Sequence, residues 1–192
     1  SAEHRAIFLQ TYRLATEELE RRAAGRAPGS WAVILDADET VLDNAPYQAR
    51  RITDGTSFED DTWAAWVEER AAGAVPGVAD FTRVAHARGI TIVFLSNRTH
   101  AMETATLDNL RALGLPTDPG TFLGQGIVVP GCEAEAGSKD CRRRLVGQRY
   151  RVLMQVGDQL GDFVEPADGT AAARQAAVDR HAGWFGERWW ML

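Results

Sequence analysis

Three short apolar runs, each followed directly by polar residues, do most to limit the folds open to this chain. The runs are WAVILD (31–36), ITIVFL (90–95) and YRVLMQV (150–156), and each has the length of a buried strand. Segments with helical spacing lie between them, so strands and helices alternate along the sequence. This alternation predicts an α/β fold with a doubly wound, Rossmann-like parallel sheet.

The rest of the pattern adds two short strands and the helices. Strands are expected at 127–129 (IVV) and at the chain end (RWWML). The expected helices cover 2–23, 60–73, 77–88, 100–113 and 170–181. The chain is 192 residues long, which suits a single domain over 1–192. The stretch at about 47–75 is expected to form a small helical cap above the carboxyl end of the sheet.

Charge and hydropathy exclude some partners. The net charge of −6 argues against a nucleic-acid polymer, since proteins that bind one usually carry a basic stripe. No apolar run approaches the roughly 18 residues of a membrane span, so no transmembrane segment is expected. A small phosphorylated substrate stays compatible with this charge because a local cationic site can hold it. The oligomeric state cannot be read from the sequence.

Polar clusters follow each of the three apolar runs. They are Asp36-Ala37-Asp38-Glu39-Thr40, Ser96-Asn97-Arg98 and Gly157-Asp158-Gln159-Leu160-Gly161-Asp162. In open parallel sheets, ligands bind beyond the carboxyl ends of the strands, so the clusters are expected to share one site. Any one of these aspartates could instead cap a helix in a loop. Three clusters at three strand ends favour the shared site.

The carboxylates of the first and third clusters indicate a division of labour and a metal. Asp36 and Asp38 are two apart, so in an extended chain both point to one side. One can attack as a nucleophile while the other gives and takes a proton. Asp158 and Asp162 add negative charge at the same edge. Four carboxylates need a compensating hard cation, and their oxygen ligands favour Mg²⁺.

The residues of these clusters resemble a known family. VILDADETVLDNAPY (33–47) and LMQVGDQLGDF (153–163) are similar to the two-part signature of the class C acid phosphatases. These are bacterial lipoprotein phosphatases of the haloacid dehalogenase-like superfamily. PGVADFTRVAHARGITIVFLSNR (76–98) looks like the segment that leads to the family's second motif. The resemblance runs from about Ser1 to Leu192 and implies a haloacid dehalogenase-like core.

The resemblance implies a Mg²⁺-dependent acid phosphatase that hydrolyses phosphomonoesters such as 5′-nucleotides and aryl phosphates. Asp36 is expected to be the nucleophile that takes the phosphoryl group. Asp38 is expected to protonate the leaving alcohol and then to activate water. Ser96, helped by the backbone near Asn97, is expected to bind a phosphoryl oxygen. Lys139 is expected to touch both the nucleophile and the phosphoryl group.

The resemblance also implies a metal site and a location. Mg²⁺ is expected at Asp36, at the main-chain oxygen of Asp38 and at Asp158, with Asp162 completing the acidic cluster. An exported, periplasmic or outer-membrane-anchored lipoprotein, with its signal removed from this chain, is expected from the family. Departures from the family are Ala37, Gln159 and the lack of a Pro/Asn/Tyr/Gly-rich tail after Leu192, which could line the site.

Lys139 is the only lysine; of the 21 lysine and arginine residues, 20 are arginines. A phosphoryl-transfer site needs positive charge near the transferred oxygens. A compact ammonium fits between a nucleophile and a phosphate better than a planar, wider guanidinium does. The alternative is a surface lysine left over in a sequence that favours arginine.

Other residues allow two interpretations. Trp63 and Trp66, with Tyr47, are expected either to form the core of the cap or to make an aromatic slot for a nucleobase or aryl group. Arg142, Arg143 and Arg144 are expected to form a solvent-exposed face, with phosphate steering as the alternative. The four histidines show no metal-ligand spacing and are expected to be structural.

Two questions stay open at this point. Cys132 and Cys141 either form a disulfide, as an exported protein would favour, or remain free thiols. The chain is either a phosphatase or a non-catalytic, phosphate-binding or storage-type relative. Plant vegetative storage proteins resemble this family and can lack the nucleophile, so the presence of Asp36 favours the enzyme.

Overall fold

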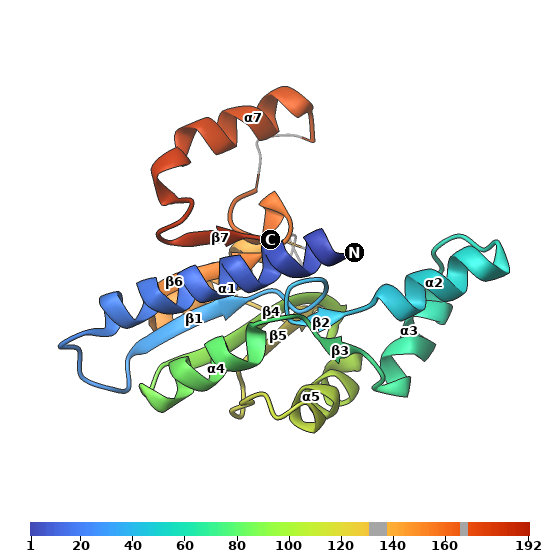
Figure 1. Ribbon diagram of the computed structural model, residues 1–192, viewed down its shortest axis with the longest axis horizontal. Helices are drawn as coiled ribbons and strands as arrows, with labels where there is room; N and C mark the ends of the chain where they lie inside the picture. Colours follow the sequence, from blue (N-terminus) through green and yellow to red (C-terminus); the bar gives the residue numbers. More distant parts are fainter. Residues whose placement is uncertain (131–137, 166–168) are drawn as a thin grey trace.

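A computed structural model describes residues 1–130, 138–165 and 169–192. Five parallel strands form its central sheet in the order β5-β4-β1-β6-β7 (Figure 1). These strands are β1 (Trp31–Leu35), β4 (Thr91–Thr99), β5 (Phe122–Gln125), β6 (Arg151–Gly157) and β7 (Trp189–Met191). The chain adds β4 and β5 on one side of β1 and then β6 and β7 on the other. The predicted doubly wound α/β fold is therefore confirmed.

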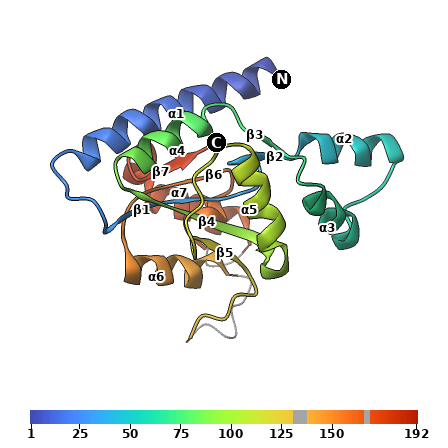
Figure 2. The same ribbon diagram turned by 90° about the horizontal axis from the view of Figure 1, so that it is seen from below.

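Helices cover both faces of this sheet. The helices α1 (Ala2–Ala23), α4 (Val78–Ala87) and α5 (Glu103–Ala112) pack on one face, and α6 (Lys139–Arg149) packs on the other (Figure 2). A further helix, α7 (Ala171–Arg180), precedes β7 at the edge of the sheet (Figure 1). Within the ranges that the structure describes, no helix is long and apolar enough to cross a bilayer.

Alternation along β1 divides the core into two layers. Val33 and Leu35 pack with the layer of α1, α4 and α5, whereas Ala32 and Ile34 face α6. Such double-sided burial explains why the strand is a continuous apolar run. The buried side chain of Tyr12, in α1, donates a hydrogen bond of 2.6 Å from its hydroxyl group to the carbonyl oxygen of Thr40. The long first helix thus braces the loop that follows β1.

The insertion after β1 contains two helices. They are α2 (Ala45–Asp54) and α3 (Asp60–Glu69), and they project to one side of the sheet (Figures 1 and 2). A two-stranded antiparallel pair, β2 (Leu42–Asp43) and β3 (Gly73–Ala74), joins the two ends of the insertion. The helix α2 was not predicted, although Pro46 in its first turn and Gly55 at its end, with φ of 65°, are ordinary helix boundaries.

One predicted strand is wrong. Residues 127–129 form no strand, and the edge strand β5 lies at Phe122–Gln125 instead. Val128 has 80% of its surface exposed, so its β-branched side chain does not indicate burial. β5 is held by its pairing with β4 rather than by an apolar pattern of its own.

Candidate active site

The parallel register brings three strand ends to one edge of the sheet. Leu35, the last residue of β1, lies in register with Phe94 of β4 and with Val156 of β6. The polar clusters after these aligned residues, of which 96–98 forms the last part of β4, therefore lie at the same edge of the sheet, and a cavity of about 250 Å³ opens among them. Its walls are formed by Asp36, Asp38, Glu39, Asn97, Lys139, Gln159, Gly161, Asp162 and Glu165.

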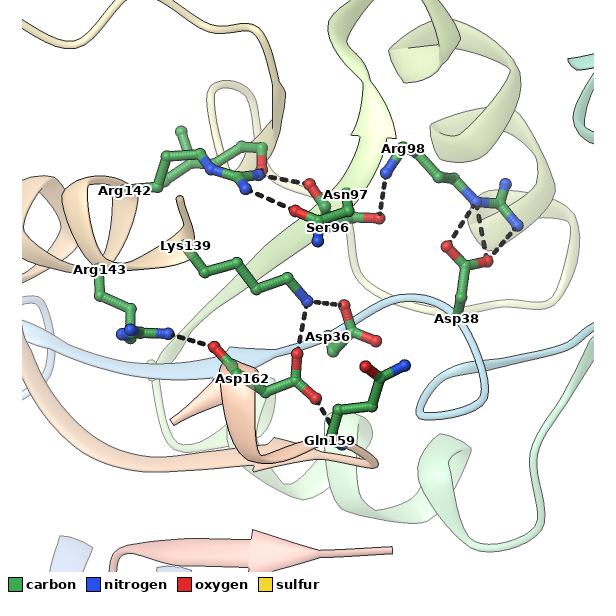
Figure 3. Close-up of polar contacts among 12 residues, drawn as sticks. Asp36, Asp38, Ser96, Asn97, Arg98, Lys139, Arg142, Arg143, Gln159 and Asp162 are labelled. Atoms are coloured by element: carbon green, nitrogen blue, oxygen red, sulfur yellow. Dashed lines mark hydrogen bonds and ion pairs between the residues drawn. The ribbon is translucent and has the colours of Figure 1, made fainter. Parts of the chain in front are cut away.

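Lys139 lies between two carboxylates in this cavity (Figure 3). Its ammonium donates to Asp36 and, at 2.6 Å, to Asp162, and all three side chains are buried. Burial alone would lower the pKa of Lys139, but the two carboxylates raise it overall. Burial raises the pKa of Asp36 well above its usual range, while the charge of Lys139 acts in the opposite direction. The ammonium therefore favours the ionised form of Asp36.

Three carboxylates lie close enough together that they could hold a metal ion. Asp36, Asp158 and Asp162 each offer an oxygen, and these oxygens lie within 4.8 Å of one another. Burial, followed by repulsion from Asp162, raises the pKa of Asp158 to about 6. Lys139 supplies one positive charge against three carboxylates, so this set of oxygen donors still fits a hard divalent cation. Asp162 already accepts hydrogen bonds from Lys139 and from the main-chain amide of Gln159, at 2.9 Å.

Asp38 is held away from this group by an arginine that the sequence analysis assigned no role. The Nε and Nη2 atoms of Arg98 donate to its carboxylate at 2.8–3.2 Å (Figure 3). The side-chain amide of Asn44 also donates to it, at 2.9 Å. Arg98 is almost fully buried. Its position two residues after Ser96, on the same side of the extended chain, was the signal that could have indicated this contact.

Ser96 and Asn97 occupy different environments. Ser96 has no exposed surface, and its hydroxyl oxygen accepts a hydrogen bond of 3.0 Å from the amide of Arg98. Asn97 is exposed and lines the cavity. The structure thus brings the side chain of Asn97, rather than that of Ser96, to the cavity wall.

The expected solvent-exposed face after Lys139 is wrong for two of its three arginines. Arg142 is 1% exposed and donates to the main-chain oxygens of Ser96 and Leu123 and to the side chain of Asn97. Arg143 is also buried and donates to the carbonyl oxygen of Gly161 at 2.7 Å, whereas Arg144 is exposed. Because the sequence pattern did not predict α6, the position of these side chains against the sheet could not be foreseen.

The aromatic residues of the insertion are only partly available to a ligand. Tyr47 and Trp66 are 3% and 2% exposed, and the indole N–H of Trp66 donates to Asn44 at 2.8 Å. Trp63 is partly buried, contacts Tyr47 edge-on and lies under the guanidinium of Arg98, 5.3 Å from its ring. Burial therefore places Tyr47 and Trp66 in the core of the insertion and leaves Trp63 as the candidate for a substrate slot.

Glu39 is a cavity residue that the sequence analysis left without a role. Its φ of 55° is unusual for a residue other than glycine. Burial, followed by the charge of Asp38, raises the pKa of Glu39 to about 7. Its side chain accepts a hydrogen bond of 3.3 Å from the amide of Asn44, so the loop after β1 carries a third acidic group toward the cavity.

The remaining sequence-based expectations concern residues outside the cavity. Three of the histidines are exposed and His181 is partly buried, as expected. Cys141 is buried in α6 and is disulfide-bonded. Cys132, the other residue of the predicted pair, lies outside the described residues.

Comparison with known proteins gives the class to which this fold and site belong. The chain matches the haloacid dehalogenase (HAD) superfamily, subfamily IIIB (Acid phosphatase), over residues 2–192. It therefore belongs to this family, and the resemblance stated from the sequence is confirmed. Among solved structures it is similar to the class C acid phosphatase from Bacillus anthracis, with 30% identity and a TM-score of 0.89. That match covers 100% of this chain and 78% of the other.

The comparisons also give a second structure of that bacterial phosphatase and several curated relatives, one of them a storage protein. A structure of the Class C acid phosphatase from Bacillus anthracis with tungstate bound is 30% identical, with a TM-score of 0.87 and the same coverage. Vegetative storage protein 2 of Arabidopsis thaliana is 29% identical over 142 residues, or 71% of this chain and 51% of the relative. Acid phosphatase 1 of Solanum lycopersicum is 26% identical over 131 residues, or 68% and 51%. The chain spans about half the length of these curated relatives.

Proposed function

We propose that this protein is a metal-dependent acid phosphatase that hydrolyses phosphomonoesters through an aspartyl-phosphate on Asp36. The observation that carries the proposal is the buried contact of Lys139 with Asp36 and Asp162 in a cavity at the carboxyl edge of the sheet. A buried ammonium beside a carboxylate can hold a phosphoryl group next to its nucleophile.

The reaction would take two steps. In the first, a carboxylate oxygen of Asp36 attacks phosphorus, the bond from phosphorus to the leaving alcohol breaks, and Asp38 gives a proton to the alcohol oxygen. In the second, water attacks the aspartyl-phosphate, the bond from Asp36 to phosphorus breaks, and Asp38 takes a proton from the water. In the structure, Arg98 and Asn44 donate hydrogen bonds to the carboxylate of Asp38 and so fix its position.

Mg²⁺ is the proposed metal. Asp36, Asp158 and the main-chain oxygen of Asp38 would hold it, with Asp162 positioned by Lys139 beside them. When bound, the ion supplies positive charge for the phosphoryl oxygens. The all-oxygen donor set and the raised pKa of Asp158 support a hard divalent cation at this place.

The proposed substrates are small phosphomonoesters, with 5′-nucleotides and aryl phosphates preferred. A partly exposed Trp63 beside Arg98 offers a flat surface for an aromatic leaving group. Tungstate is a tetrahedral oxyanion like phosphate, and its presence in a relative's structure supports an oxyanion site here. The cavity of about 250 Å³ suits a phosphoryl group and a small part of its leaving group, which supports a small substrate.

A non-catalytic, phosphate-binding or storage-type protein is the second candidate, and the vegetative storage proteins among the relatives favour it. Asp36, Asp38 and Lys139 are all present in this chain and argue for the enzyme. We also propose an exported location, of the lipoprotein type found in the bacterial family. The disulfide at Cys141 supports an oxidising compartment.

Hydrolysis of p-nitrophenyl phosphate with and without EDTA tests the proposed function. The wild type should be active in Mg²⁺ and should lose its activity in EDTA. Asp36→Asn should be inactive while it stays folded, because the amide is nearly isosteric but cannot attack phosphorus. Uncatalysed phosphate-monoester hydrolysis is so slow, with enzymatic accelerations of up to ~10²¹-fold, that no residual rate should be measurable. An inactive wild type would instead favour the storage-type protein.

A further inference from the structure

Arg142 is a buried guanidinium for which the proposed reaction has no use. It is 1% exposed and follows Lys139 by one turn of α6. Its Nη atoms donate to the main-chain oxygen of Ser96 and to the side-chain oxygen of Asn97 at 2.7 Å (Figure 3), and to the main-chain oxygen of Leu123 at 3.0 Å. These three acceptors belong to β4 and β5, while Nε donates to the main-chain oxygen of Ser138, next to α6, at 3.3 Å. One planar group therefore ties two strands to the helix that carries Lys139.

The contact with Asn97 determines which end of its amide faces the cavity. An asparagine side chain has one accepting and one donating end of nearly equal shape, whereas a guanidinium only donates. The oxygen of Asn97 must therefore face Arg142, and its NH₂ group points elsewhere. That NH₂ group donates no hydrogen bond to any residue that the structure describes, and Asn97 lines the cavity beside Lys139 and Asp36.

We propose that Arg142 is a positioning residue that orients Asn97 so that its NH₂ group, rather than its oxygen, is presented to the phosphoryl group. The inference rests on the proposed phosphatase function, because the donor is useful only if an oxyanion enters the cavity. With the amide reversed, an oxygen would face the oxygens of the phosphate and repel them. Arg142 prevents this reversal without touching the substrate.

The three-way contact also explains why an arginine is needed at position 142. Its fork reaches two main-chain oxygens and one side-chain oxygen at the same time. A lysine would keep the charge but would place a single point donor among these acceptors, so Asn97 would be free to rotate. Arg142→Lys is therefore the variant that isolates orientation from charge.

A double-mutant cycle with Arg142→Lys and Asn97→Ala tests the proposal. Each variant is assayed for kcat and KM with p-nitrophenyl phosphate and for the inhibition constant of orthophosphate. Asn97→Ala should raise the inhibition constant of orthophosphate about tenfold or more, because a hydrogen bond to a charged group is lost. In the wild-type background, Arg142→Lys should raise this inhibition constant to a similar extent. In the Asn97→Ala background, it should raise the constant less than about threefold. Arg149→Lys, an exposed change on the same helix, should leave all constants unchanged.

Asn97→Asp provides a second measurement, which does not depend on the folding of an Arg142 variant. It puts an oxygen at both ends of the side chain, so it should raise the inhibition constant of orthophosphate more than Asn97→Ala does. A purely structural role for Asn97 would give the reverse order, because Asn97→Asp keeps the shape and the contact with Arg142. That reverse order would contradict the proposal.

The possible failures are distinguishable. Equal losses from Arg142→Lys with and without the side chain of Asn97 would overturn the inference alone, since Arg142 would then only brace the strand ends. An inactive wild type would overturn the proposed function. In that case, calorimetric titration with orthophosphate measures the dissociation constants of the wild type and the same variants, so the double-mutant cycle can be completed without catalysis. A wild type that neither turns over p-nitrophenyl phosphate nor binds orthophosphate would overturn both.

Discussion

Lysine and arginine have separate tasks at the residue scale. Lys139 sits between two buried carboxylates, where a compact ammonium can donate in several directions. Arg98 and Arg142 each spread a planar fork over several acceptors. The single lysine in an arginine-rich chain therefore stands where a point charge fits and a fork does not.

Lys139→Arg should lower kcat for p-nitrophenyl phosphate at least tenfold although the charge is kept. The wider guanidinium has to displace the carboxylate of Asp36 or that of Asp162, and both contacts are buried. Steady-state kinetics on the purified variant, with thermal unfolding as the folding control, measure this. A variant as active as the wild type would mean that the lone lysine has no special task.

At the element scale, the two tryptophans of α3 divide between core and site. Trp66 is buried and donates to Asn44, and the side-chain amide of Asn44 in turn donates to Asp38. Trp63, less buried, lies against Arg98, which also holds Asp38. Both tryptophans of this helix therefore contact a side chain that holds Asp38. Of the two, Trp63 keeps more exposed surface, and we propose it for the substrate slot.

Trp63→Ala should reduce the preference for aryl phosphates and 5′-nucleotides over glycerol phosphate by about 2- to 13-fold. This range corresponds to ring stacking worth about 0.5 to 1.5 kcal/mol beyond burial. Trp66→Ala should instead destabilise the fold, by about 3 to 5 kcal/mol, because it empties a buried site. A panel of kcat/KM values together with urea unfolding separates the two effects. Unchanged selectivity in Trp63→Ala would leave the proposed slot without support.

On the scale of the whole molecule, the fold gathers acidic groups at one edge of the sheet. Burial raises the pKa of Asp158 to about 6 and that of Glu39 to about 7. Between about pH 4 and 7 the folded chain therefore holds more protons at these groups than the unfolded chain does. Their contribution to stability is present at low pH and is lost as the pH rises through 6 and 7.

Without metal, the free energy of unfolding should fall between pH 5 and pH 7.5 by about 1 kcal/mol after allowance for solvent screening, or roughly 2–4 °C in Tm. Excess Mg²⁺ should reduce this slope, because a bound cation favours the ionised carboxylates. Urea unfolding in EDTA and in Mg²⁺ at both pH values is the measurement. Glu39→Gln and Asp158→Asn should each flatten the slope in EDTA. A free energy of unfolding that rises from pH 5 to pH 7.5 in EDTA would contradict this prediction.

The elements that the sequence predicted correctly are those whose pattern comes from burial within the chain's own core. β1, β4 and β6 are apolar because helices cover both of their faces, and α1 shows its buried residues at helical spacing. The expected strand at 127–129 was wrong because an edge strand depends on its partner more than on its composition. α6 was missed because its exposed and buried faces both carry arginines.

For the site, the sequence by itself determined which residue types reach the carboxyl edge of the sheet. Asp36, Asp158 and the single Lys139 were identifiable because each strand end is followed by a polar cluster and the composition singles out one lysine. Only the tertiary structure decided the partners of the arginines. Arg98 meets Asp38, and Arg142 meets Asn97, across 60 and 45 residues of chain. Such contacts depend on register and helix docking, and no local pattern encodes the distance between residues so far apart.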